Sequence, residues 1–116
     1  MRRDIQDRAE AYAVRAVKLY QHLQRGGDGA ASVLGKQYMR AATSIGANLV
    51  EAESGESRRD FIHKCSIAQK EARESKYWLC LLLKADLVSS TQVADLIDEN
   101  DQLIAILTAI IVKAKR

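Results

Sequence analysis

The chain of 116 residues contains no proline, one phenylalanine, one tryptophan and two cysteines. Without proline, long uninterrupted helices are favoured. Cys65 and Cys80 are separated by about 22 Å if they share one helix, too far for a disulfide, so we predict buried reduced thiols. No apolar run approaches the length of a membrane span, and the N-terminal residues lack the apolar segment of a secretory signal. We therefore expect a cytoplasmic protein that does not enter a membrane.

Hydrophobic residues make up 47% of the sequence and charged residues 28%, which are proportions typical of a folded domain. The length suits one domain with one core, and we predict a single domain over residues 1–116. Eighteen basic residues against 15 acidic ones give a net charge of +3. So small a net charge does not by itself indicate nucleic-acid binding, which depends on how the charges are distributed.

Apolar residues recur at steps of three and four, which is the period of helices with one buried face. They predict helices over residues 4–25, 32–53, 58–85 and 90–115, separated by the polar or glycine-containing segments GGDGAAS, SGES and DLVSS. We expect GGDGAAS to be a flexible connection. No stretch shows the alternation of a β-strand. Four helices with short connections predict an all-α, antiparallel up-down four-helix bundle.

The third predicted helix contains the segment YWLCLLL, residues 77–83, which is apolar around its whole circumference. A surface helix of a small monomer needs only one apolar face. We therefore predict that a second copy of the chain covers part of this segment and that the protein is a homo-oligomer. The residues predicted at this interface are Tyr77, Trp78, Leu81 and Leu82.

Polar residues interrupt the apolar pattern at two places. Arg40, Ser44, Asn48 and Glu51 lie on one side of the second predicted helix, and Asn100 is the one polar residue in the apolar seam of the fourth. We predict that all five form a structural polar network at helix or subunit boundaries. A functional site on the second helix is the alternative.

No pattern in the sequence indicates an enzyme. Asp60 and His63 have the spacing of two metal ligands on one helix, but the second copy of this motif is missing, so we predict neither a metal nor a cofactor. Glu71 and Glu74 lie among basic residues, which favours ionised carboxylates in salt links over acid–base catalysis.

The segment SIGANLVEAESGESRRDFIHKCSIAQKEARESKYWLCLLL resembles the four-helix-bundle proteins encoded within intervening sequences of bacterial large-subunit ribosomal RNA genes. The resemblance covers about residues 33–112. The first helix departs from it, because it lacks the family's aromatic-rich opening. Three motifs carry the resemblance, and their matching residues are Arg40, Ser44, Ile45, Gly46, Asn48 and Glu51; then Ser57, Asp60 and Phe61; then Ile67, Ala68, Lys70, Glu71, Ala72, Glu74, Ser75, Tyr77, Trp78 and Leu79.

The resemblance implies an up-down bundle that assembles into a ring, usually a pentamer, with no established enzymatic activity. It also implies kinship with the accessory bundle protein of diversity-generating retroelements, whose basic ring is associated with nucleic acid and with a reverse transcriptase.

Two hypotheses for function follow. In the first, basic residues at helical spacing bind the phosphates of RNA or DNA. These residues are Arg8, Arg15, Lys18 and Arg25 in the first helix and Arg59, Lys70 and Arg73 in the third. In the second, the bundle is a scaffold that docks another polypeptide without contacting nucleic acid. Basic residues clustered on one rim of the ring favour the first hypothesis, and basic residues scattered among acids favour the second.

Overall fold

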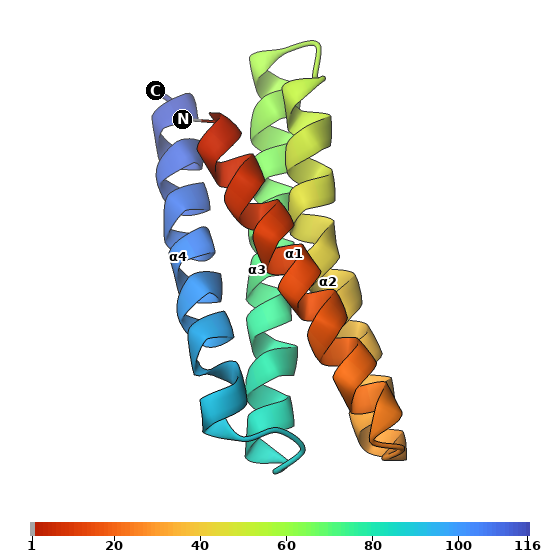
Figure 1. Cartoon of the computed structure of the whole chain (residues 1–116). Coiled ribbons are helices and arrows are strands. Elements are labelled where there is room, and N and C mark those ends of the chain that lie inside the picture. Colours follow the sequence, from red (N-terminus) through yellow and green to blue (C-terminus); the bar gives the residue numbers. More distant parts are fainter. Residues whose placement is uncertain (1) are drawn as a thin grey trace.

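The computed structural model describes the backbone of residues 2–116 and the side chains of residues 4–116. It contains the helices α1 (Arg2–Arg25), α2 (Gly29–Glu53), α3 (Arg58–Lys84) and α4 (Ser90–Ala114). Consecutive helices run antiparallel, and the two chain ends lie at the same end of the molecule (Figure 1). The predicted all-α, antiparallel four-helix bundle is confirmed.

The connection between α1 and α2 is shorter than the sequence pattern predicts. Gly27 takes a left-handed φ of 77°, and Asp28 already caps α2, its carboxylate accepting a hydrogen bond of 2.9 Å from the backbone N–H of Ala31. The helix therefore begins at Gly29, so only Gly26, Gly27 and Asp28 connect the two helices, and the predicted start of the second helix at residue 32 was wrong. Capping by Asp28 satisfies an otherwise free N–H group, which offsets the low helix propensity of the glycine that follows.

The next two helices begin at the serines expected from the sequence. The Ser57 hydroxyl accepts a hydrogen bond from the backbone N–H of Asp60, and Ser89 forms a reciprocal capping box with Gln92. Asp86 takes a positive φ of 60° just after α3, where the chain turns back toward α4. These local contacts set the ends of the helices within the bundle.

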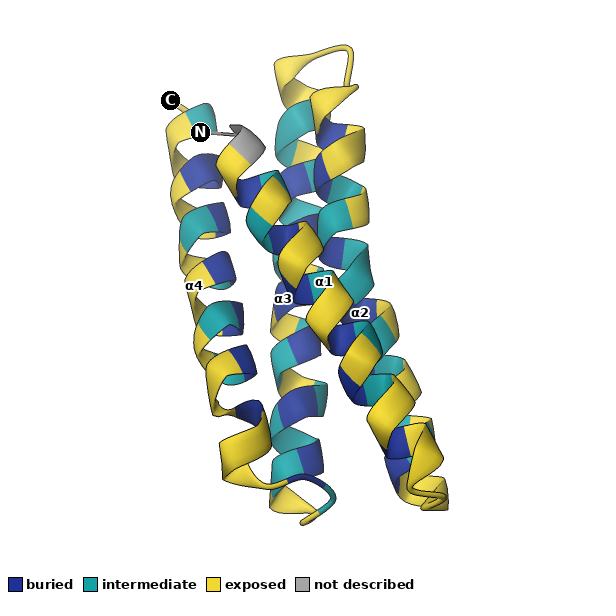
Figure 2. Ribbon diagram, in the orientation of Figure 1, coloured by how far each residue is buried: buried dark blue, intermediate teal, exposed yellow. Residues whose placement is uncertain are grey.

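Each helix buries one side in a shared core, seen as dark blue stripes facing inward (Figure 2). α1 and α3 each pack on α2 and on α4, and their backbones do not come close to one another, so they occupy diagonal corners of the bundle. α1 lies closer to α2 than to α4. Gly46 of α2 faces the backbone of Ala9 on α1, where a small residue allows the two helices to approach. The bundle is 46 Å long and about 20 Å across.

Candidate nucleic-acid interface

One polar residue from each helix meets the others in the middle of the core. Tyr12, Tyr38, Ser75 and Asn100, here called the polar layer, are each at most 1% exposed. The Asn100 carbonyl oxygen accepts hydrogen bonds from the hydroxyls of Tyr12 at 2.6 Å and Ser75 at 2.7 Å, and its amide donates to the Ala72 carbonyl at 2.8 Å. Tyr38 donates to the Tyr12 hydroxyl at 2.9 Å. The layer is closed to solvent, so its role is structural.

The two tyrosines of the polar layer are neutral at physiological pH. Burial raises the pKa of Tyr12 to about 12, and it raises the pKa of Tyr38 further above the ordinary value. Both hydroxyls therefore keep their protons and donate them within the layer. The sequence pattern places Asn100 correctly in the seam of α4. It identifies Tyr12 and Tyr38 only as core residues, because nothing in the pattern shows that they share a level with Asn100.

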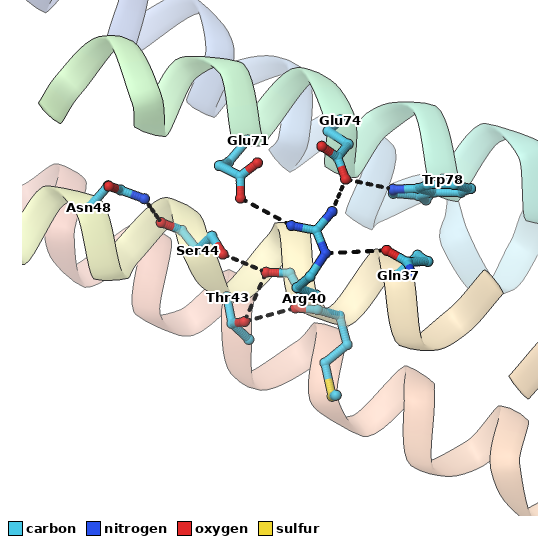
Figure 3. A network of polar contacts seen from close by, with 9 residues as sticks. Gln37, Arg40, Thr43, Ser44, Asn48, Glu71, Glu74 and Trp78 are labelled. Atoms are coloured by element: carbon cyan, nitrogen blue, oxygen red, sulfur yellow. Dashed lines mark hydrogen bonds and ion pairs between the residues drawn. The ribbon is translucent and has the colours of Figure 1, made fainter. Parts of the chain in front are cut away.

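Arg40 connects α2 to α3 through its guanidinium group (Figure 3). It forms an ion pair with Glu71 at 3.4 Å and a second one with Glu74, and its Nε donates to Gln37. The indole N–H of Trp78 also donates to Glu74, at 3.0 Å. The prediction that Glu71 and Glu74 take part in salt links is confirmed, and the cation that binds them comes from the neighbouring helix.

The other polar residues predicted to join this network make separate contacts. The Ser44 hydroxyl donates to the Arg40 carbonyl of its own helix, and the Asn48 amide donates to the Ser44 carbonyl (Figure 3). Glu51 forms an ion pair with Lys64 of α3 at 2.8 Å. Asn100 belongs to the polar layer, with no hydrogen bond to the α2 residues. The single predicted network is therefore four separate sets of contacts, of which three join different helices and that of Ser44 and Asn48 lies within α2.

Basic residues line the outer side of α3. The residues concerned share a sector of about 80° around the helix, since each residue advances the helix by about 100°. All are exposed, and none forms an ion pair or hydrogen bond with another described residue. The set, here called the α3 basic stripe, comprises the basic residues Arg59, His63, Lys70, Arg73 and Lys84, together with Tyr77, which lies in the same sector.

Three carboxylates beside the middle of the α3 basic stripe are paired within the chain. No Asp or Glu of α3 falls within the stripe's sector. Glu71 and Glu74, on the side toward α2, are bound by Arg40. On the side toward α4, Asp101 pairs with Lys76 at 2.7 Å, and this contact raises the pKa of Lys76. The middle of the stripe, at Lys70 and Arg73, therefore presents positive charge beside carboxylates that already have cation partners.

The basic residues of α1 have different surroundings. Arg8 donates to Glu99 at 2.7 Å and to Gln102 of α4, and the Glu99 contact raises the pKa of Arg8. Arg15 and Lys18 border a groove between α1 and α4, whose remaining lining residues are Leu19, His22, Gln92 and Leu96. This part of α4 also carries Asp95, Asp98 and Glu99. Arg25 is exposed at the end of α1. The α1 cations thus lie beside an acidic helix, on a different side of the bundle from α3.

The apolar segment of α3 divides between core and surface. Leu82 and Leu79 have no exposed surface within the single chain. Leu82 is therefore a core residue, and its prediction as an interface residue was wrong. Tyr77 is 59% exposed, while Trp78 and Leu81 are half-buried. Only part of the segment thus remains for a second copy of the chain to contact.

The remaining candidate ligands do not gather into a site. Asp60 and His63 are both exposed, and His22 approaches Gln92 at 3.4 Å. Over residues 4–116, no three His, Cys, Asp or Glu side chains come together as metal ligands would. Cys65 is buried and Cys80 half-buried, and the two do not form a disulfide. None of the four helices, as far as they are described, has the length and apolar character needed to cross a bilayer.

Comparisons with known proteins agree with this architecture. A search of curated proteins finds no match. A crystal structure of a protein of unknown function from the S23 ribosomal protein family of Bacteroides thetaiotaomicron is 39% identical, with a TM-score of 0.86. The similarity covers 92% of this chain and 97% of that one. The family model described as 23S rRNA-intervening sequence protein matches residues 2–109, so the match includes α1 although its opening is not aromatic-rich. The chain belongs to the 23S rRNA-intervening sequence protein family.

Proposed function

We propose that the protein is a non-enzymatic accessory protein that binds nucleic acid through the α3 basic stripe. The observation that carries this proposal is the exposed row of cations on α3 whose neighbouring carboxylates are already bound by Arg40 and Lys76. At Lys70 and Arg73, nucleic-acid phosphates therefore meet positive charge beside carboxylates that already have cation partners. The family description refers to an intervening sequence of 23S rRNA, so RNA is the first ligand to test.

The dimensions of the stripe suit a polyanion. Arg59 and Lys84 are 25 residues apart on one helix, which corresponds to about 37 Å, most of the 46 Å length of the bundle. Phosphate contacts supply most of the sequence-independent affinity of nucleic-acid-binding proteins. If the Arg and Lys side chains at positions 59, 70, 73 and 84 each bind one phosphate, the logarithm of the affinity falls with the logarithm of salt concentration with a slope of about 3 on single strands.

The α1 cations are less suited to this role. Arg8 is already bound to Glu99, and Arg15 and Lys18 face the acidic first half of α4. Acids beside a cation lower the local positive potential and repel phosphates. Helical spacing indicates both sets of cations as candidates, and the charges around them favour α3.

A charge-reversal pair tests the assignment. Lys70→Glu with Arg73→Glu should weaken RNA binding at least tenfold at low salt and flatten the salt dependence by about 1.4, the contribution of two phosphates on a single strand. The matched control is Arg15→Glu with Lys18→Glu, which makes the same charge change on α1. It should leave the RNA affinity within about threefold of that of the intact protein. Fluorescence anisotropy with a labelled RNA measures both. Circular dichroism and light scattering check that the fold and the assembly are unchanged.

Three results would contradict the proposal. Intact protein that binds neither RNA nor DNA at low salt would rule out nucleic-acid binding. Equal losses of RNA affinity in the two variants would indicate that the net charge of the protein attracts RNA and that no particular face of the bundle binds it. A loss only in the α1 variant would move the site to the groove between α1 and α4.

Docking of another polypeptide is a second candidate function, and the groove beside Arg15 and Lys18 favours it. The cations of the groove suit the acidic side of an amphipathic helix, and Leu19 and Leu96 suit its apolar side. A partner protein that co-purifies with the Lys70→Glu, Arg73→Glu variant and is lost with the Arg15→Glu, Lys18→Glu variant would support this function.

A further inference from the structure

An aromatic ring lies in the middle of the α3 basic stripe. Tyr77 follows Arg73 by one helical turn and Lys70 by two, and Lys84 lies two turns beyond it, so cations flank the ring along the helix at about 6 to 11 Å. Its side chain is 59% exposed. Of the Phe, Tyr and Trp residues, all within the described part of the chain, Tyr12 and Tyr38 are buried and Tyr20, Phe61 and Trp78 are partly buried, so Tyr77 has the most exposed ring.

Neighbouring side chains hold this ring in place. The rings of Tyr77 and Trp78 meet edge to face, with centroids 5.1 Å apart and an angle of 73° between the planes. Trp78 is itself fixed by the hydrogen bond from its indole N–H to Glu74, and Glu74 is bound by Arg40 (Figure 3). The exposed ring therefore rests on a chain of contacts that extends across to α2. A pre-positioned ring loses little conformational freedom when a ligand packs against it.

We infer that the Tyr77 ring stacks on an unpaired base, and that the α3 basic stripe therefore binds single-stranded nucleic acid in preference to duplex. In a duplex, each base face is covered by the next base pair, so a surface aromatic ring reaches only sugars and phosphates. In a single strand, base faces are open, and stacking on an aromatic ring is favourable for every base. Cations on both sides of the ring bind the phosphates that precede and follow the stacked base. This inference rests on the proposed function, and it replaces the prediction that Tyr77 contacts a second copy of the chain.

The test measures how three forms of the protein bind one RNA, as a single strand and as a duplex. The probes are an unstructured single-stranded RNA of about 20 nucleotides and the same strand annealed to its complement. The proteins are the intact chain, Tyr77→Ala, and Tyr77→Phe, which keeps the ring. Tyr77→Ala should weaken single-strand binding about tenfold and leave duplex binding within about twofold. Tyr77→Phe should bind both probes like the intact protein.

Trp78 provides an independent readout, because it is the only tryptophan in the chain and contacts Tyr77. Its fluorescence should be quenched by the single strand much more than by the duplex at equal saturation. Light scattering of Tyr77→Ala measures whether the substitution changes the molecular mass of the protein in solution.

The inference is overturned if Tyr77→Ala leaves single-strand affinity unchanged, lowers affinity for both probes equally, or reduces the molecular mass of an oligomer, which would show that a second copy covers the ring. It is also overturned if the duplex binds more tightly than the single strand. In each of these cases, sensitivity of duplex binding to Lys70→Glu with Arg73→Glu still supports the proposed function. Failure of both probes to bind the intact protein rejects the proposed function itself.

Discussion

Replacing Asn100 with leucine tests whether the polar layer stabilises the fold. A buried polar residue in an otherwise apolar helix seam often lowers stability while fixing register, so the position alone suggests that leucine would stabilise the bundle. The structure predicts the reverse. Asn100 takes part in three hydrogen bonds, to Tyr12, Ser75 and the Ala72 carbonyl, and it has no exposed surface. Leucine makes none of these bonds.

The magnitude follows from three contributions. Losing three buried hydrogen bonds costs about 1 kcal/mol each. Fitting the bulkier leucine into a closed site costs about 1–3 kcal/mol more. Burying its apolar surface returns about 2 kcal/mol. We therefore expect Asn100→Leu to lower the free energy of unfolding by about 2–4 kcal/mol and the melting temperature by about 10 °C or more.

Urea denaturation followed by circular dichroism at one fixed protein concentration measures this change. Ser75→Ala supplies the control through a double-mutant cycle. If Asn100 and Ser75 act through their shared hydrogen bond, Asn100→Leu should cost at least about 0.5 kcal/mol less in the Ser75→Ala background than in the intact chain. A leucine variant as stable as the intact protein, or costs that simply add, would refute the reasoning.

Three further predictions concern stability and assembly. Because burial raises the pKa of Tyr12 to about 12, the unfolded chain releases this proton near pH 10 while the folded chain keeps it. Between pH 10 and 12, Tyr12 should therefore lower the free energy of unfolding by up to about 3 kcal/mol. Tyr38, whose pKa burial raises further, should add to this fall, so denaturation at each pH should show a smaller total fall in Tyr12→Phe. A Cβ added at Gly46 would lie 3.7 Å from the Ala9 Cβ, an ordinary contact, so Gly46→Ala should raise the free energy of unfolding by up to about 1 kcal/mol; a drop in melting temperature would contradict this. The homo-oligomer, including the pentamer that the resemblance implies, stays a prediction, and a monomeric mass in light scattering at micromolar concentration would reject it.

Much of the fold follows from local features of the sequence. Apolar residues at steps of three and four predict all four helices, and Ser57 and Ser89 mark the beginning of two of them because a serine cap acts on N–H groups only three residues away. The start of α2 was missed because three glycines in four positions suggest a flexible segment, whereas the Asp28 side chain caps the helix within it. Helix periodicity and capping depend on near neighbours, so sequence patterns reveal most of them.

The candidate site depends on residues that are distant in the chain. From the sequence alone, Arg15 on α1 and Arg73 on α3 are equivalent cations at helical spacing. Tertiary packing separates them, because it brings Arg40 of α2 to Glu74 of α3 and leaves the acids of α4 beside α1. The polar layer likewise joins residues that are 25 to 88 positions apart. A helical pattern shows which side a residue occupies, but the potential it feels and the partners it binds depend on which helix packs against that side.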